Sequence, residues 1–68
     1  MIGITIIGRE WVEDPEAPGR RKEVIAFAVT DLALVDSILT VYPHTGDGSI
    51  VLVRSDGSSY FLIDGVWQ

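Results

Sequence analysis

The stretch SIVLVRSDGSSYFLI, residues 49–63, decides the fold class, because it places two β-rich runs around an Asp-Gly pair. Both runs are short and rich in β-branched or aromatic side chains, and the residues between them favour a tight turn. If the Asp-Gly pair, residues 56–57, occupies the centre of a type I′ turn, Val53 lies opposite Tyr60. The sequence therefore predicts an antiparallel β-hairpin in this register.

Both faces of this predicted hairpin are apolar, whereas an antiparallel sheet with one face in water shows polar residues on that face. We therefore expect the hairpin to be covered twice, by its own core and by a second layer. The second layer is the loop with Trp11, the segment around Leu34, or another subunit. After the hairpin, a second Asp-Gly pair at residues 64–65 turns the chain, so that Val66 and Trp67 fold back as a lid on the otherwise exposed face.

Three further strands are expected upstream of the hairpin. The run VIAFAVT places Ile25, Phe27 and Val29 on one face and smaller side chains on the other, which suits a strand beneath another layer. The segment TDLALVDSI is ambiguous between one helical turn, capped by Thr30, and a bend between strands. The five expected strands cover residues 2–7, 24–30, 37–42, 49–54 and 59–63.

These elements predict an all-β or mostly β chain that forms one small domain over residues 1–68. The expected architecture is a five-stranded antiparallel curled sheet or an SH3-like barrel, with or without one short helical turn around residues 31–37. The resemblance to SH3-like barrels rests on strand count and loop length alone, because the peptide-binding signature ALYDY is missing. Binding of proline-rich ligands is therefore not expected.

The chain is short for its content of apolar residues. With 68 residues it buries only about 60% of its unfolded surface on folding, while 47% of its residues are hydrophobic and none is cysteine. Disulfide bonds and thiolate metal sites, which stabilise many small domains, are thus excluded. We expect apolar side chains that one copy cannot bury, and hence a homo-oligomer or an obligate protein partner.

Ten acidic and five basic residues give a formal net charge of −5 and an isoelectric point of about 4.4. Phosphate binding requires clustered cations, so direct binding to nucleic acid is not expected, and a protein partner with a basic surface is favoured. The N-terminal run lacks a basic region and a small-residue cleavage site, which favours a cytoplasmic chain. The apolar segment at residues 20–43 contains Asp31 and Asp36, which disfavour a membrane span.

No residue pattern indicates catalysis, and no cofactor or metal site is expected. The single histidine, His44, lies in a Pro- and Gly-rich turn. The neighbours that superficially complete a Ser-His-Asp set are Thr45, Asp47 and Ser49. Residues that share one tight turn rarely adopt the geometry of a catalytic triad, so a solvated turn is the favoured interpretation. One histidine without cysteine cannot build a zinc site, and an enzyme that uses His44 is the least favoured hypothesis.

The segment that most suggests a function is REWVEDPEAPGRRK, residues 9–22, which we expect to be a loop. Its one aromatic residue lies among acidic residues. The candidate partner-binding residues are Trp11, Glu10, Glu13, Asp14 and Glu16. An exposed indole offers contact area and cation-π attraction, while the acids steer a basic partner. The alternative is that Trp11 packs onto the end of the core and the acids keep the loop in water.

The sequence favours a non-catalytic protein-protein interaction module that self-associates through an apolar sheet face and binds a partner through its acidic loop. One concrete version is a small inhibitor, encoded by a phage or other mobile element, whose carboxylates occupy a surface on the target meant for nucleic acid. The alternative is a structural or assembly subunit buried in a larger complex. Salt dependence of partner binding separates the two, because ionic strength weakens acidic-loop recognition but not apolar docking.

Overall fold

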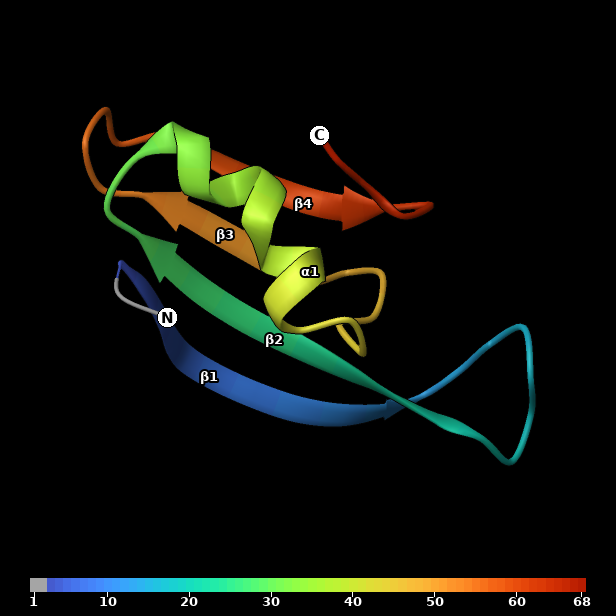
Figure 1. The fold of residues 1–68 in the computed structure, drawn as a ribbon. Coiled ribbons are helices and arrows are strands. Elements are labelled where there is room, and N and C mark those ends of the chain that lie inside the picture. The colour runs from blue at the N-terminus through green and yellow to red at the C-terminus, as the bar shows by residue number, and fades with distance from the viewer. Residues whose placement is uncertain (1–2) are drawn as a thin grey trace.

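A computed structural model describes residues 3–68 (Figure 1). The strands are β1 (Ile4–Glu13), β2 (Arg21–Val29), β3 (Ile50–Val53), β4 (Ser59–Ile63) and β5 (Val66–Trp67). The 3-10 helix η1 (Leu32–Ser37) continues directly into the short α-helix α1 (Ile38–Val41), so that the two form one helical segment of 10 residues. The protein is mostly β, as the sequence predicted. Within residues 3–68, no helix is long and apolar enough to cross a membrane.

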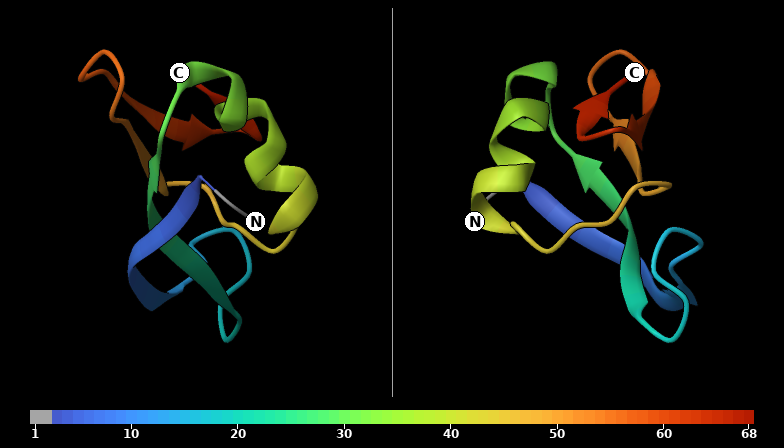
Figure 2. Two further views of the ribbon diagram at one scale, coloured as in Figure 1. Left: turned by 60° about the vertical axis from the view of Figure 1, so that its left-hand side comes forward. Right: turned by 90° about the vertical axis from the view of Figure 1, so that its right-hand side faces the viewer.

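The five strands form one mixed sheet in the order β1-β2-β3-β4-β5. Neighbouring strands are antiparallel except β2 and β3, which run parallel and pair Phe27 with Val51. A parallel pair cannot be joined by a tight turn, and the helical segment provides the crossover, covering one face of the sheet (Figures 1 and 2). The expected antiparallel sheet and SH3-like barrel are therefore wrong: the sheet is mixed, and it does not close because β1 and β5 lie at opposite ends.

Residues 37–42, which the sequence predicted as a strand, lie mostly in the helical segment. Its first turn is capped by Asp31 and not by the predicted Thr30: the Asp31 carboxylate accepts a hydrogen bond of 2.9 Å from a backbone N–H two residues further on. Val35 and Ile38, three positions apart, are both buried in the core. The helix prevails because it buries these two side chains on one face while it spans the crossover. The predicted helical turn around residues 31–37 is confirmed as part of this segment.

The first hairpin is longer than the sequence indicated. Half of the segment at residues 9–22, expected as a loop, is strand: β1 runs to Glu13, β2 starts at Arg21, and residues 14–20 connect them. Trp11 therefore lies on a strand and not in a loop. Antiparallel pairing satisfies the backbone groups that a loop of this length would leave to water, and aromatic and β-branched residues suit it.

The core lies between the sheet and the helical segment. Strand β2 contributes Ile25, Phe27 and Val29, the large face that the sequence predicted, and all three are buried. The other buried apolar side chains come from β1, the helical segment, β3 and β4: Ile4, Val35, Ile38, Val51, Val53 and Leu62. Since each fully buried large apolar side chain contributes roughly 1.5–3 kcal/mol, this cluster supplies the main driving force for folding.

The hairpin of β3 and β4 is confirmed, but its register differs from the predicted one by two residues. Tyr60 pairs with Val51 instead of Val53. The turn is wider than expected, because Gly57 alone among residues 54–57 has a positive φ, of 75°, whereas a type I′ turn requires two such residues. A shift of two residues keeps every side chain on its predicted face, so one face is buried and the other remains apolar and exposed.

The chain folds back after β4, as the sequence predicted. The Asp-Gly pair at residues 64–65 has φ angles of 52° and 79°, so the type I′ turn lies here. Trp67 pairs with Leu62, and its ring meets that of Phe27 edge to face, with 6.4 Å between centroids. Val66 lies on the other face and is 56% exposed. The predicted return of the chain is confirmed, but the predicted lid on the exposed face is wrong: Trp67 packs against the core face, and Val66 leaves the other face exposed.

Candidate protein-binding site

The outer part of the first hairpin projects from the body of the protein. We call residues 9–24 the arm; it extends past the helical segment and gives the molecule an elongated shape, with extents of 38 × 20 × 18 Å (Figure 1). Its strands pair continuously, from Arg9 opposite Ile25 to Glu13 opposite Arg21. Strand pairing therefore fixes the backbone of the arm, and most of its side chains are exposed.

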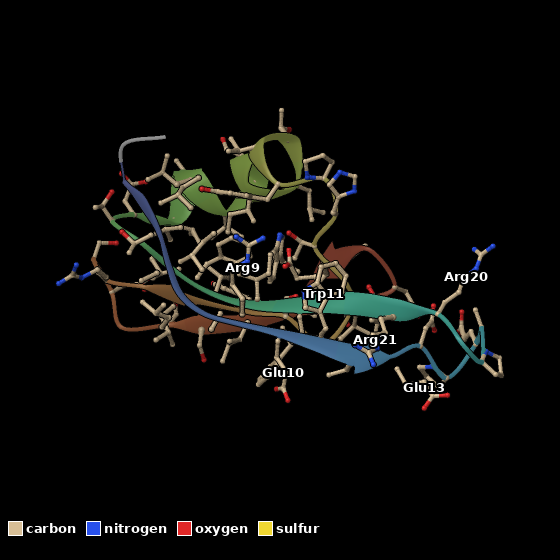
Figure 3. All side chains as sticks on the ribbon, turned by 90° about the horizontal axis from the view of Figure 1, so that it is seen from below. Arg9, Glu10, Trp11, Glu13, Arg20 and Arg21 are labelled. Atoms are coloured by element: carbon tan, nitrogen blue, oxygen red, sulfur yellow. The ribbon has the colours of Figure 1, made fainter. Side chains whose placement is uncertain are left out.

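A β-bulge decides which side chains of the arm face which side. It lies between Ile6 and Gly8, where the register shifts by one residue. The alternation along β1 inverts at this point, so Arg9 and Trp11 lie on the same side as Ile6, which faces the core. Figure 3 shows Arg9 and Trp11 on this side, toward the helical segment, and Glu10 on the opposite side.

Trp11 is 62% exposed, the largest value among the exposed large hydrophobic residues of the described chain. It lies opposite Glu23 in the arm. The structure thus places the indole on the open side of the arm and not on the end of the core.

An ion pair fixes the base of the arm. Arg9 Nη2 lies 2.8 Å from Glu23 Oε1, and the guanidinium donates three hydrogen bonds of 2.8–3.1 Å to this carboxylate. Glu23 is only 7% exposed. These hydrogen bonds, together with the negative charge of Glu23, raise the pKa of Arg9. The backbone carbonyl of Glu23 also accepts a hydrogen bond of 2.7 Å from the N–H of Gly46, which ties the arm to the body.

Beside Trp11 lies an open hollow of about 540 Å³. Its lining residues are Trp11, Glu13, Gly19, Arg20 and Arg21. The hollow combines one indole, one carboxylate and two guanidinium groups, so it offers an aromatic face together with hydrogen-bond acceptors and donors. The surroundings of Trp11 therefore carry both signs of charge.

The structure distributes the five predicted binding residues over three places. Trp11 and Glu13 line the hollow together. Glu10 lies on the opposite face of the arm (Figure 3). Asp14 and Glu16 lie in the connection between the strands, where the Asp14 carboxylate accepts a hydrogen bond of 3.0 Å from the backbone N–H of Glu16.

The two arginines of the hollow were not among the predicted binding residues. Arg21 pairs with Glu13 across the hairpin, and Arg20 directly precedes it. The basic run at residues 20–22 was visible in the sequence as the only cationic cluster. Its position beside Trp11 follows from the strand register, which composition alone does not give.

The turn that contains His44 is built from hydrogen bonds to the backbone. His44 itself is exposed. The Thr45 hydroxyl donates to a backbone carbonyl at 2.7 Å, and the buried Ser49 Oγ donates to one carbonyl and accepts from one N–H. The Asp47 carboxylate accepts from two backbone N–H groups of the turn between β4 and β5. Each of these side chains is thus engaged in holding the turns together.

Charge is divided unevenly between the arm and the body. The arm holds four of the five cationic residues and five of the ten acidic residues, a net charge of −1, whereas the rest of the chain carries −4. The cationic residues of the arm are Arg9, Arg20, Arg21 and Lys22. The body is therefore the main source of the negative field, while the arm is locally mixed.

A scan of protein-family models and searches of curated proteins and of solved structures found no match to this chain.

Proposed function

We propose that this chain is a non-catalytic protein-protein interaction module that binds its partner through the arm. The supporting observation is Trp11, exposed over 62% of its surface on a strand that is fixed by pairing and by the ion pair at the base of the arm. Burial of a large apolar side chain yields roughly 1.5–3 kcal/mol, and Trp is enriched among the residues that dominate binding energy. Because the arm is already ordered by strand pairing, binding costs little conformational entropy.

The proposed partner presents a basic surface with at least one carboxylate. The net charge of −4 on the body attracts a basic surface, within a screening length of about 8 Å at physiological salt. At contact, a cationic side chain of the partner stacks on Trp11 and pairs with Glu13. A carboxylate of the partner meets the guanidinium groups of Arg20 and Arg21, whose geometry suits bidentate pairing.

One form of this function is inhibition of a nucleic-acid-binding protein. Such a target has a basic groove for phosphates, and a chain with a net charge of −5 competes for that groove. Glu16, in the connection between the strands, extends the contact along the target surface.

The test compares three tagged chains in the cells that make the protein: the wild type, Trp11→Ser and the control Leu32→Ser. Leu32 is an exposed apolar residue of the helical segment, so the control removes a comparable side chain away from the arm. Mass spectrometry quantifies the proteins retained by each chain, and the one retained by both wild type and control is then purified and titrated. We expect Trp11→Ser to bind this partner at least tenfold more weakly. Equal affinity of the two variants contradicts the proposal.

A structural or assembly subunit is the second candidate, favoured by the apolar face of the sheet that one copy leaves exposed. Binding through the arm depends on charges near the surface, and added salt weakens it by screening. Docking through an apolar face does not weaken with salt. Titration of the purified partner at low and high ionic strength therefore separates the two functions.

A further inference from the structure

The face of the sheet opposite the helical segment, which we call the outer face, is left uncovered by that segment (Figure 2). Strand register aligns its side chains in two rows that cross the sheet from β1 to β4. The first row is Gly8, Ala26, Ile50 and Phe61, and the second is Thr5, Ala28, Leu52 and Ser59. Ile63 and Val66 continue the face toward β5. None of these ten described residues is charged, so the rows form one continuous uncharged surface.

The outer face has small residues on one half, which we call the low half, and large residues on the other, which we call the high half. Its first row has two small residues on β1 and β2, Gly8 and Ala26, and two large residues on β3 and β4, Ile50 and Phe61. Phe61 is 50% exposed. A hollow of about 290 Å³ lies beside the small residues; it is lined by Gly8, Ala26 and Ile50 together with Val24 and Ile25, and Arg9 and Glu10 also border it. An apolar cavity of ~150 Å³ holds a benzene molecule, so this hollow has room for a phenyl ring.

We infer that the outer face binds a second copy of this chain. A twofold axis that lies in the interface, parallel to the strands and between β2 and β3, reverses the order of each row. It places Phe61 of one copy over Gly8 of the other. It likewise places Ile50 over Ala26, so that the high half of each copy fills the low half of the other. Two sheets packed in this way lie about 10 Å apart, the spacing at which their side chains interdigitate.

The second row agrees with this arrangement. The same axis places Leu52 over Ala28, again a large residue over a small one. The broad side of the molecule measures 38 × 20 Å, about 760 Å². Because this side includes the arm, the two rows cover only part of it, and the predicted contact is smaller than the about 800 Å² per partner of a standard interface.

The free edge of β1 is the longest strand edge at which two copies could instead pair by extending the sheet. The bulge at Ile7 interrupts the regular spacing of its backbone groups. Charged side chains on the strand, including Arg9 and Glu10, also oppose pairing with an identical edge. The outer face is therefore the favoured contact, and the experiment separates the two.

The test measures the dimer dissociation constant by sedimentation equilibrium for the wild type, Phe61→Ala, Gly8→Phe, the double variant with both changes, and Leu32→Ala. A Cβ atom at Gly8 meets nothing nearer than the Cβ of Ala26, at 3.8 Å, and phenylalanine suits a strand, so Gly8→Phe retains the fold. Leu32 is 50% exposed, as is Phe61, but lies on the helical segment. Leu32→Ala is therefore a matched control.

We expect the wild type and the control to dimerise with the same dissociation constant. Phe61→Ala leaves the hollow empty and Gly8→Phe sets two phenyl rings against each other, so each raises the dissociation constant at least tenfold. The double variant again places a large residue over a small one and recovers part of this loss, a coupling that independent damage to the fold does not produce. Losses that simply add in the double variant overturn the inference. A monomeric wild type also overturns it, because the outer face would then be free to bind a different protein. A dimer that all the variants retain overturns it as well, because that result is expected if the two copies pair through the edge of β1.

Discussion

Replacement of Trp67 by alanine or by phenylalanine separates two properties of its indole. The ring covers Phe27, with 6.4 Å between centroids, and closes the core beside Leu62. The Nε1–H is buried and has no hydrogen-bond partner within residues 3–68. Alanine removes the ring contact, whereas phenylalanine keeps an aromatic ring and removes the unpaired donor.

The two substitutions should lower the free energy of unfolding by clearly different amounts. Truncation of a fully buried Trp costs about 3–5 kcal/mol, and because Trp67 is partly exposed we expect Trp67→Ala to cost about 2–4 kcal/mol. A chain of 68 residues, at roughly 0.05–0.15 kcal/mol per residue, has a total stability of about 3–10 kcal/mol, so this loss is a large fraction of it. A buried unpaired N–H costs about 1–3 kcal/mol of stability. Phenylalanine buries less apolar area than tryptophan, but it also removes this unpaired N–H, so the loss and the gain offset each other. Trp67→Phe should therefore stay within about 1 kcal/mol of the wild type.

Urea denaturation followed by far-ultraviolet circular dichroism measures both changes, since this signal does not depend on the indole that is removed. The midpoint should fall strongly for Trp67→Ala and little for Trp67→Phe. Equal losses in the two variants would show that the indole N–H has a partner that contributes as much as the ring. An unchanged midpoint for Trp67→Ala would refute the claim that the C-terminal hairpin closes the core.

Two further substitutions test local interactions. Ser49→Ala removes the acceptor of the buried Ile25 N–H, 3.0 Å away, and should cost about 1–3 kcal/mol in the same denaturation assay; no loss would mean that this N–H finds another acceptor. Hydrogen bonds from Ser58 lower the pKa of Asp56, so the stabilisation by this carboxylate is fully present above its unfolded-state pKa and disappears as the pH falls through its folded-state pKa. The melting temperatures of the wild type and Asp56→Ala should therefore differ at neutral pH and converge in acid, and a difference that is constant with pH would contradict this reasoning.

The parts of the fold that depend on neighbours in the sequence could be predicted. The alternation of Ile25, Phe27 and Val29 with smaller residues identified the buried face of β2. The composition around residues 56–57 predicted the second hairpin. The Asp-Gly pair at residues 64–65 predicted the turn after which the chain folds back along β4. In each case the signal is a local period or a turn preference.

The predictions from the sequence were wrong where pairing between distant segments decides the structure. Residues 37–42 form a short apolar run that fits both a strand and a helix, and the crossover between parallel strands selects the helix. The sequence contains no local signal for the parallel pairing of β2 with β3. The register of the second hairpin was wrong for a related reason, since residues 54–57 form a wider turn than the Asp-Gly pair alone indicates.

The candidate protein-binding site, too, could be predicted from the sequence only in part. Trp11 could be identified from composition, as an aromatic residue within a charged segment. Its neighbours in space could not, because strand alternation places adjacent Glu10 on the opposite face, while strand pairing brings Arg21 from the other strand to the hollow. The bulge at Ile7, which sets this alternation, left no mark in the pattern of the sequence.

The outer face as a contact between two copies is most directly tested by nuclear Overhauser effects in a sample that mixes isotope-labelled and unlabelled chains, filtered so that only signals between chains remain. The proposed arrangement predicts intermolecular signals from the ring protons of Phe61 to the methyl group of Ala26 and the α protons of Gly8, since the twofold axis brings these groups together. Intermolecular signals confined to β1, or the absence of any in a sample concentrated well above the dissociation constant, would contradict it.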